Sequence, residues 1–363
     1  MEYMNRALEL ARDALGTTSP NPAVGAVLVN NGNVVGEGFT QPYGGPHAEV
    51  EAIRQAGHKA KNSTIYVTLE PHCFQGSTPS CTSAIINAGI DEVHIAALDP
   101  NPKVNGLGKK ELENAGLRVI FEESKEALEI TEGFAKHIRT NMPFVTVKFA
   151  MSLDGKISTH SGDSKWITGE SSRAMAHELR RISDAVMIGS NTVLRDCTRL
   201  TARNEQGKPL DKQPLKIVVD SHGKLPDDSS IFKGPGETLI ATTNMSRSKI
   251  DRLTNQGITV VNIPQDETGI SLTKLLEFLG SAGIVNLLVE GGGTLIGSFF
   301  DKGLVDKIHA FLAPIIIGGR GALSPVEGIG AKNISQSLNL ANFSVERIGS
   351  DLMLKAYPHG RNR

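Results

Sequence analysis

The sequence predicts an α/β protein with two domains, on three observations. The chain has 363 residues, a length that corresponds to about two domains of ordinary size. Along both halves, short apolar runs typical of strands alternate with stretches that carry apolar residues at every third or fourth position, as helices do. The segment Asn141-Met142-Pro143 breaks this alternation and is expected to separate residues 1–142 from residues 143–363.

Residues 1–142 are predicted to form a three-layer α/β sandwich. Residues 3–15 carry apolar side chains at helical spacing, and Gly16 ends this helix. Two apolar runs on either side of Asn30-Asn31-Gly32 predict a β-hairpin. Further helices are expected at 46–55, 80–88, 109–114 and 125–140, and further strands at 64–70, 92–99 and 117–122.

Residues 143–363 are predicted to form a second α/β domain with a mostly parallel sheet. The run that follows Pro143 reads as a buried strand that ends in a polar turn. The remaining strands are expected at 184–189, 215–221, 237–243, 259–263, 286–291, 307–317 and 345–356, and the helices at 171–182, 247–256, 271–282 and 294–302.

Composition excludes several classes of protein. Lys plus Arg number 38 and Asp plus Glu number 39, so the chain lacks the basic excess of a nucleic-acid-binding protein. Three cysteines cannot form a disulfide framework. The first residues lack the apolar core of a signal peptide, and the longest apolar run, 310–317, is too short to span a membrane. A cytoplasmic enzyme is therefore expected.

The first half carries a group of residues that could bind a metal ion. His47 and Glu49 stand at the start of a predicted helix, and Pro71, His72, Cys73 and Cys81 follow the next strand. This order approximates the H-x-E…P-C-x-x-C pattern of zinc deaminases. Imidazole and thiolate are good zinc ligands, and three protein ligands leave a fourth position for the water that zinc activates. Glu49 is expected to shuttle a proton from that water to the ring and the departing ammonia.

The segments TSPNPAVGAVLV, GPHAEVEAI and VTLEP, with the loop residues Gly76, Thr78 and Pro79 before Cys81, resemble one family in particular. They are similar to the N-terminal domain of the bifunctional riboflavin-biosynthesis deaminase–reductases. The resemblance implies a cytidine-deaminase-like α/β/α fold and one zinc ion per chain.

The chain departs from the family pattern at the second zinc ligand. The family has a Cys directly after the Pro, whereas this chain has His72 there, then Cys73, and Phe74 where the family usually has His. An ungapped match gives His47, His72 and Cys81 as the ligands, and a shift by one residue replaces His72 by Cys73. The ungapped set is favoured, because the family ligand directly follows the Pro.

A second motif follows the strand expected at 286–291. The strand delivers Glu290, three glycines follow, and a helix begins near Thr294. A glycine-rich backbone lets a pyrophosphate approach closely, and a helix N-terminus can donate N–H groups to it. The alternative is a tight strand–helix turn that needs glycine for its backbone conformation. The segment does not match the G-x-G-x-x-G fingerprint, so the motif alone leaves both interpretations open.

The second half also contains the segments VKFAMSLDGKIS, SKWITGESSR, LRRISDAVMIGSNTVLRD, RLTAR, IVVDS and LLVEGGGTLIGSFF. With these segments, most of residues 143–363 resemble the dihydrofolate-reductase-like domain of the same family, which uses NADPH to reduce the ribosyl group of a 5-phosphoribosylamino-uracil. The family usually has Asp-Pro after Asp196, where this chain has Cys197-Thr198. The resemblance implies substrate contacts at Ser164, Arg180, Leu200, Arg203 and Glu290, and cofactor contacts at Ala150, Trp166, Thr192, Asp196, Ser221, Gly292, Gly293, Thr294, Leu295, Ile296, Gly297 and Ser298.

Together these observations predict a two-step enzyme of riboflavin biosynthesis. It would deaminate a diaminopyrimidine ribosyl phosphate and then reduce the resulting uracil with NADPH, and the family implies a homodimer or homotetramer. One alternative is a reductase with a degenerate deaminase domain, suggested by His72 and Phe74. A nucleic-acid-editing deaminase and a zinc-stabilised scaffold are further alternatives, but balanced charge disfavours the first and Glu49 beside the ligands disfavours the second.

Overall fold

The computed structural model describes residues 2–74, 80–196, 198–267 and 269–360. The chain divides into two compact units between Met142 and Pro143. No described helix is long and apolar enough to cross a membrane. The predicted loop residues Gly76, Thr78 and Pro79 and the divergent Cys197 lie outside the described residues.

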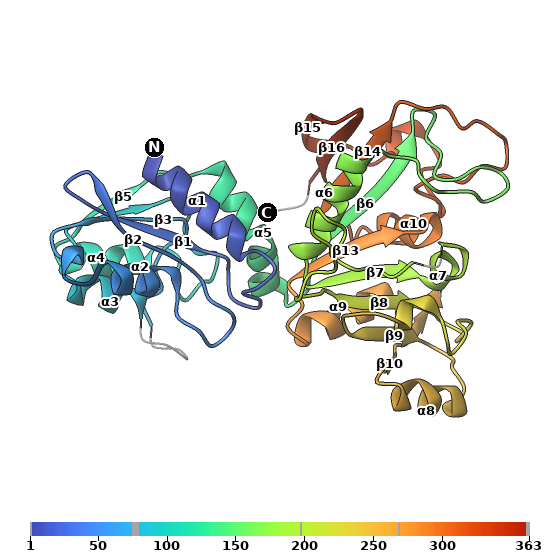
Figure 1. Cartoon of the computed structure of the whole chain (residues 1–363), viewed down its shortest axis with the longest axis horizontal. Helices are drawn as coiled ribbons and strands as arrows, with labels where there is room; N and C mark the ends of the chain where they lie inside the picture. Colours follow the sequence, from blue (N-terminus) through green and yellow to red (C-terminus); the bar gives the residue numbers. More distant parts are fainter. Residues whose placement is uncertain (1, 75–79, 197, 268, 361–363) are drawn as a thin grey trace. The chain divides into compact units, whose positions relative to one another are not determined.

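The first unit is a five-stranded sheet between two layers of helices, with the strand order β2-β1-β3-β4-β5. Strands β2, β1 and β3 pair antiparallel, and β3, β4 and β5 pair parallel. Helices α1 and α5 cover one face of the sheet, and α2, α3 and α4 cover the other (Figure 1). The bounds are α1 Glu2–Ala14, β1 Gly25–Asn30, β2 Asn33–Phe39, α2 Ala48–Ala56, β3 Thr64–Val67, α3 Cys81–Asn87, β4 Glu92–Ile95, α4 Leu107–Asn114, β5 Arg118–Phe121 and α5 Lys125–Thr140.

Helix α2 lies directly on strand β2 because small residues line both elements. A Cβ atom on Gly38 would lie 2.3 Å from the Ala48 carbonyl oxygen, and one on Gly36 would lie 2.1 Å from that of Ala52. Both alanines are fully buried. This close backbone approach fixes the start of α2, where His47 and Glu49 were predicted to act.

The second unit contains a nine-stranded sheet with the order β10-β9-β8-β7-β13-β6-β14-β16-β15. Neighbouring strands from β10 to β14 are parallel, which confirms the mostly parallel sheet, and β14, β16 and β15 are antiparallel. The apolar sides of α9 and α10 pack on one face, and those of α6, α7 and α8 on the other. The helices are α6 Glu170–Arg181, α7 Ser190–Asp196, α8 Arg247–Asn255, α9 Leu272–Ser281 and α10 Gly293–Asp301.

The strands of this unit show where the sequence pattern was incomplete. The segment expected as one terminal strand is a hairpin of β15 and β16, with Gly349 at a positive φ of 62° in its turn. Strand β15 is exposed along most of its length, so alternation of apolar residues did not reveal it. Helix α7 and the short pair β11 and β12 were also not predicted. The strands are β6 Phe144–Ser152, β7 Ala185–Gly189, β8 Leu215–Val219, β9 Thr238–Thr242, β10 Thr259–Asn262, β11 Gln265–Asp266, β12 Gly269–Ile270, β13 Asn286–Gly291, β14 Lys307–Ala313, β15 Leu340–Ile348 and β16 Asp351–Pro358.

The close contact between α2 and β2 can be tested by a Gly38→Ala substitution. The added methyl group forces α2 away from the sheet, which is expected to lower the free energy of unfolding by about 1–3 kcal/mol. Urea denaturation followed by circular dichroism measures this change. Gly321→Ala is the control, because a Cβ there meets only the His160 side chain at 3.7 Å. Equal stability of the two variants would contradict the packing argument.

Candidate active sites

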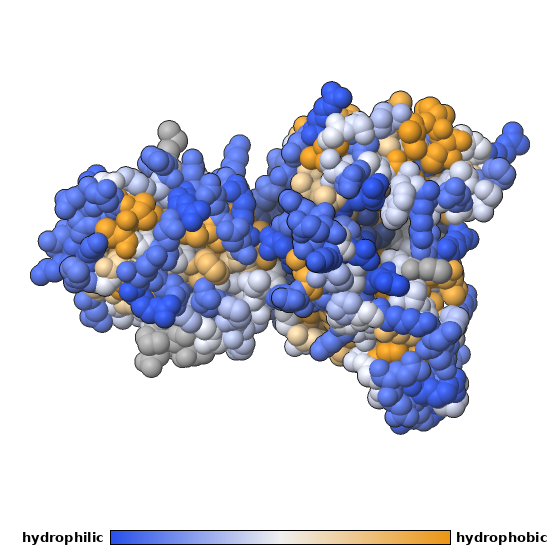
Figure 2. Space-filling model, in the orientation of Figure 1, coloured by the Kyte–Doolittle hydropathy of each residue, from blue (hydrophilic) through white to orange (hydrophobic). Residues whose placement is uncertain are grey.

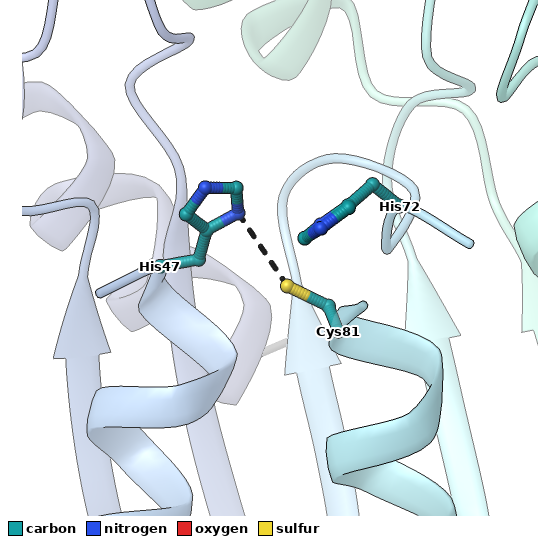
Figure 3. Close-up of side chains that lie close together, drawn as sticks. All are labelled: His47, His72 and Cys81. Carbon is teal, nitrogen blue, oxygen red and sulfur yellow. Dashed lines mark hydrogen bonds between the residues drawn. The ribbon is translucent and has the colours of Figure 1, made fainter. Parts of the chain in front are cut away.

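Three predicted zinc ligands converge in the first unit. His47 is the N-cap residue of α2, His72 follows β3, and Cys81 is the first residue of α3. Their ligand atoms all lie within 4.8 Å of one another, and Cys81 Sγ lies 3.5 Å from His47 Nδ1. Figure 3 shows the three side chains directed toward one another. The sequence therefore brings the ligands together from three segments.

The chemistry of this cluster fits a zinc ion. His72 Nδ1 is buried and has no hydrogen-bond partner among the described residues. Burial, together with neighbouring His47, lowers the pKa of His72 to about 4, so its imidazole is in the neutral, metal-binding form at pH 7. Burial also raises the pKa of the Cys81 thiol, so its thiolate needs a nearby cation. Three protein ligands, rather than four, are typical of a catalytic site.

Glu49 lies in the first turn of α2, beside this cluster. Its side chain is buried, and burial raises the pKa of its carboxyl group, although the His47 charge opposes the shift. The carboxyl group also interacts with Cys81. A buried acid with a raised pKa next to a metal site has the properties of a proton-transfer group.

Cys73, the other candidate for the second ligand, lies outside the cluster. Its thiol is directed toward the Lys103 carbonyl oxygen at 3.9 Å. Of the two neighbours His72 and Cys73, only His72 belongs to the ligand cluster. Phe74 contacts the His72 ring edge-on, with 5.7 Å between ring centroids. The geometry thus favours His72 over Cys73.

Glu70 fixes the backbone just before His72, a role that the sequence analysis missed. Its buried carboxylate accepts hydrogen bonds from the backbone N–H groups of Gly106 and Lys109 at 2.9 Å, and of Asp99 at 3.2 Å. A carboxylate at the start of α4 also interacts favourably with the helix dipole. The signal was a charged residue at the end of the run TIYVTLE, which is otherwise free of charges.

The second unit has a cleft of about 700 Å³ at the carboxyl ends of its parallel strands. Of the predicted substrate and cofactor residues, those lining the cleft are Ala150, Ser164, Trp166, Arg180, Thr192, Asp196, Leu200, Arg203, Glu290, Gly292, Gly293, Thr294 and Ile296. Those outside its lining are Ser221, Leu295, Gly297 and Ser298.

Two of the residues outside the lining have clear structural roles. A Cβ on Gly297 would lie 2.0 Å from the Glu327 carbonyl oxygen, so the absence of a side chain lets a loop pack on α10. The Ser221 carbonyl oxygen accepts hydrogen bonds from the backbone of Thr243 and Asn244. By contrast, a Cβ on Gly292 would lie 3.0 Å from Thr192 Oγ1 inside the cleft.

A buried ion cluster forms one wall of the cleft. The Glu290 carboxylate accepts hydrogen bonds from both Nε and Nη2 of Arg180, the latter at 2.8 Å. It also lies 3.4 Å from Lys148 Nζ. Burial alone would raise the pKa of Glu290, but Arg180 and Lys148 lower it to about 2. Arg180 also donates to the Thr201 carbonyl oxygen. These three charges connect β13, α6 and β6.

Lys148 is a cleft residue that the sequence analysis missed. It lies two positions before Ala150 on β6, so the alternation of a strand places both on one face. The lining contains seven Lys or Arg residues against three Asp or Glu residues, an excess that suits ligands carrying phosphate groups. The cations are Lys148, Lys165, Arg173, Arg180, Arg195, Arg199 and Arg203, and the acids are Asp196, Glu290 and Glu327.

Comparison with known proteins decides the family. Residues 143–354 match the RibD C-terminal domain, and residues 1–97 match the cytidine and deoxycytidylate deaminase zinc-binding region. The riboflavin biosynthesis protein RibD of Aquifex aeolicus is 42% identical over 97% of this chain and 96% of its own length. The chain belongs to the RibD family. RibD of Actinobacillus pleuropneumoniae is 40% identical over 98% of this chain and 94% of its own length.

Solved RibD structures agree over nearly the whole length. Acinetobacter baumannii RibD superimposes with a TM-score of 0.86 at 35% identity, and 98% of each chain is covered. A Thermotoga maritima protein, described as a diaminohydroxyphosphoribosylaminopyrimidine deaminase and 5-amino-6-(5-phosphoribosylamino)uracil reductase, gives 0.83 at 33% identity, also covering 98% of each chain.

Membership of the RibD family confirms the predicted fold class, with a cytidine-deaminase-like part followed by a RibD reductase part. The chain is a bifunctional enzyme of riboflavin biosynthesis, both a deaminase and a reductase, and its cofactors are zinc and NADPH. The His47, His72 and Cys81 cluster fits the zinc-binding region.

The choice between His72 and Cys73 can be tested by zinc content. His72→Ala removes one of three ligands and is expected to weaken zinc binding at least a hundredfold, whereas Cys73→Ser leaves about one zinc per chain. Atomic absorption after dialysis against a chelator measures both. Loss of zinc from the Cys73 variant alone would instead assign the ligand to Cys73.

The Glu290 ion cluster predicts a pH dependence of stability. Because the folded pKa of Glu290 is about 2 against an ordinary 4.5, its ionised form contributes stability above about pH 4.5. That contribution, about 3 kcal/mol, is lost as the pH falls from 4.5 toward 2. Glu290→Gln is therefore expected to be less stable than the parent at neutral pH, with a difference that shrinks in acid.

Urea denaturation at neutral pH and at about pH 3 measures that difference. The matched control is Glu277→Gln, whose exposed side chain pairs with Lys274 and should change stability little at either pH. A stability difference for Glu290→Gln that stays constant with pH would show that the carboxylate is not held by these cations.

Proposed function

We propose that residues 1–142 form the deaminase domain and residues 143–363 the reductase domain. The first acts on 2,5-diamino-6-(5-phosphoribosylamino)pyrimidin-4-one, which loses an amino group by hydrolysis. The second reduces the ribosyl group of the resulting 5-amino-6-(5-phosphoribosylamino)uracil to a ribityl chain. The strongest support is that one chain carries both the His47, His72 and Cys81 cluster with Glu49 and a cationic cleft with a glycine-rich turn.

In the deaminase domain, we propose that His47, His72 and Cys81 hold the zinc, which supplies Lewis-acid activation of a water molecule. Glu49 accepts a proton from that water and passes it to the substrate. As the water oxygen bonds to the ring carbon, this first proton goes to the ring nitrogen. Glu49 then carries the second proton of the water to the amino group, the carbon–nitrogen bond breaks, and the amino group leaves as ammonia. Burial of Glu49 supports this role, because it raises the pKa of the carboxyl group and so makes its protonated form a more accessible proton donor.

In the reductase domain, NADPH supplies the hydride that goes to the first carbon of the ribosyl group. Opening the sugar ring leaves an alkoxide that needs a proton, and we propose that Lys148 provides it. Glu290 holds the Lys148 ammonium group in the cleft at 3.4 Å. We also propose that Arg203, whose Nε donates to Thr201 Oγ1, binds the substrate phosphate, and that Ser164, Leu200 and the Arg180–Glu290 pair bind the rest of the substrate.

For the cofactor, we propose contacts with Ala150, Trp166, Thr192, Asp196 and the start of α10. The backbone of Gly292, Gly293 and Thr294 lines the cleft at a helix N-terminus, where a pyrophosphate is favourably bound. Ile296 on the same helix also lines the cleft, whereas Leu295, Gly297 and Ser298 lie outside the lining, as does Ser221 after β8.

A reductase with a degenerate deaminase domain is the alternative. His72 and Phe74 motivate it, but the three ligand groups still converge and Glu49 lies beside them. Exchange of a thiolate ligand for an imidazole raises the net charge of the metal ion together with its ligands. This change alters the acidity of the bound water but does not remove the site.

We also propose a homo-oligomer in the cytoplasm. Strand β15 is an edge strand with exposed apolar side chains at Leu340, Phe343 and Val345, a surface that a second copy would cover. Figure 2 shows hydrophobic residues gathered at the end of the second unit that carries β14, β15 and β16. Cys73 and Cys81 form no disulfide, which suits a reducing compartment.

Glu49→Gln tests the deaminase assignment. Loss of the proton acceptor is expected to slow ammonia release about a thousandfold, while zinc content and NADPH oxidation with the deaminated substrate stay at parent levels. Glu51→Gln is the control, since Glu51 lies on the same helix but outside the ligand cluster. Parent-level ammonia release by the Glu49 variant would remove Glu49 from the mechanism.

Sedimentation of the chain tests the oligomer. We expect the parent to sediment as a dimer or larger, and a Phe343→Glu, Val345→Glu double variant to shift toward the monomer, because charges on an apolar interface are poorly solvated. Val34→Glu is the control, since Val34 is also an exposed apolar residue on an edge strand, 45% exposed on β2. A monomeric parent would refute the proposal.

A further inference from the structure

Trp166 is an exposed aromatic residue on the wall of the reductase cleft. It is 71% exposed, although exposure of so large an apolar side chain to water is unfavourable. The cleft lining also includes Ala150, Thr192 and Gly292, which are proposed to contact the cofactor. An exposed indole ring can present one face to such a ligand only if a neighbouring group fixes its orientation.

Arg173 on helix α6 contacts the Trp166 ring and can fix its orientation. Its guanidinium carbon lies 4.8 Å from the centre of the Trp166 ring, within the range of a cation–π interaction. Arg173 Nη1 also donates to the Thr168 carbonyl oxygen at 2.8 Å, two residues beyond Trp166. The guanidinium group therefore covers one face of the indole ring, and the high exposure of Trp166 leaves the other face open to the cleft.

The segment before Trp166 is fixed as well. Ser164 Oγ donates to Asp196 Oδ1 and Lys165 Nζ to the Asp196 carbonyl oxygen, both at 2.8 Å. These bonds tie the segment to α7, whereas Arg173 ties it to α6. Trp166 thus lies between two anchors, and Arg173 is the one that contacts the ring itself.

Helix α6 is itself held in place at its first turn. The buried carboxylate of Asp351, on β16, accepts hydrogen bonds from the Gly169 N–H at 2.8 Å and from Ser172 Oγ at 2.6 Å. From this fixed start, Arg173, His177 and Arg180 follow at helical spacing, and all three line the cleft. Arg173 is therefore attached to a rigid element, so its position can define that of Trp166.

We propose that Arg173 is a positioning residue for the reduction: it holds the Trp166 ring so that its open face receives the nicotinamide cofactor. This inference rests on the proposed contact between Trp166 and NADPH. Arg173 acts through Trp166, so its loss weakens cofactor binding more than it slows turnover at saturating NADPH. A planar guanidinium group suits this stacking better than an ammonium group, although a lysine retains the charge.

Tryptophan fluorescence of the full chain measures the arrangement directly, because Trp166 is the only tryptophan. Reduced nicotinamide absorbs where tryptophan emits, so bound NADPH quenches Trp166 by energy transfer. Arg173→Ala is expected to change the emission of the free protein, to weaken energy transfer at saturating NADPH, and to raise the Kd and KM for NADPH about tenfold with a smaller change in kcat. Arg173→Lys is expected to recover part of each effect.

Two further variants separate the possible outcomes. Arg247→Ala, which removes an exposed arginine from α8, controls for the general effect of losing a helix arginine. Trp166→Ala tests the premise, and it is expected to raise the KM for NADPH at least as much as Arg173→Ala. If Trp166→Ala leaves this KM unchanged, both the proposed cofactor contact and the positioning role are wrong. If Trp166→Ala raises it but Arg173→Ala changes neither KM nor emission, only the role of Arg173 is wrong.

Discussion

The reductase cleft depends on how one buried carboxylate is neutralised. Glu290 ends a parallel strand inside the protein, where an unpaired charge is strongly unfavourable. Arg180 from α6 and Lys148 from β6 neutralise it, and the same contacts fix these two cations at the cleft wall. Because removal of Glu290 would leave both cations without their shared partner, this one carboxylate links α6, β6 and β13 at the cleft wall.

Two other buried carboxylates are stabilised by hydrogen bonds at helix N-termini instead of by cations. Glu70 accepts backbone hydrogen bonds at the start of α4 and so fixes the chain two residues before His72. Asp351 accepts hydrogen bonds at the start of α6 and so fixes the helix that carries Arg180. In both places a carboxylate at a helix N-terminus anchors the backbone beside a functional residue, which leaves the functional side chain available for its ligand.

Much of this arrangement could be predicted from the sequence. The spacing of His47, Glu49 and Cys81 identified the metal site, because the chemistry requires these residue types near helix starts. The structure could not be anticipated where a residue acts through distant partners. Glu70 and Asp351 read as ordinary acids until the segments that they join are placed side by side.

The glycine-rich turn shows a related difficulty. Gly293 and Gly297 look alike in the sequence, but Gly297 makes room for the Glu327 loop, whereas Gly293 also lines the cleft. Lys148 could have been found, since strand alternation pairs it with Ala150. Strand β15 could not, because its exposed face lacks the alternation that marks a half-buried strand.

The central claim is that one chain performs both reactions, and a single two-stage assay tests it most directly. The zinc-loaded chain is given the diaminopyrimidine ribosyl phosphate without NADPH, and ammonia is measured; NADPH is then added and its oxidation is followed. We expect ammonia release in the first stage and NADPH oxidation in the second, with no more NADPH oxidised than the total amount of ammonia released. No ammonia in the first stage, from a preparation that oxidises NADPH when given the deaminated uracil, would contradict it.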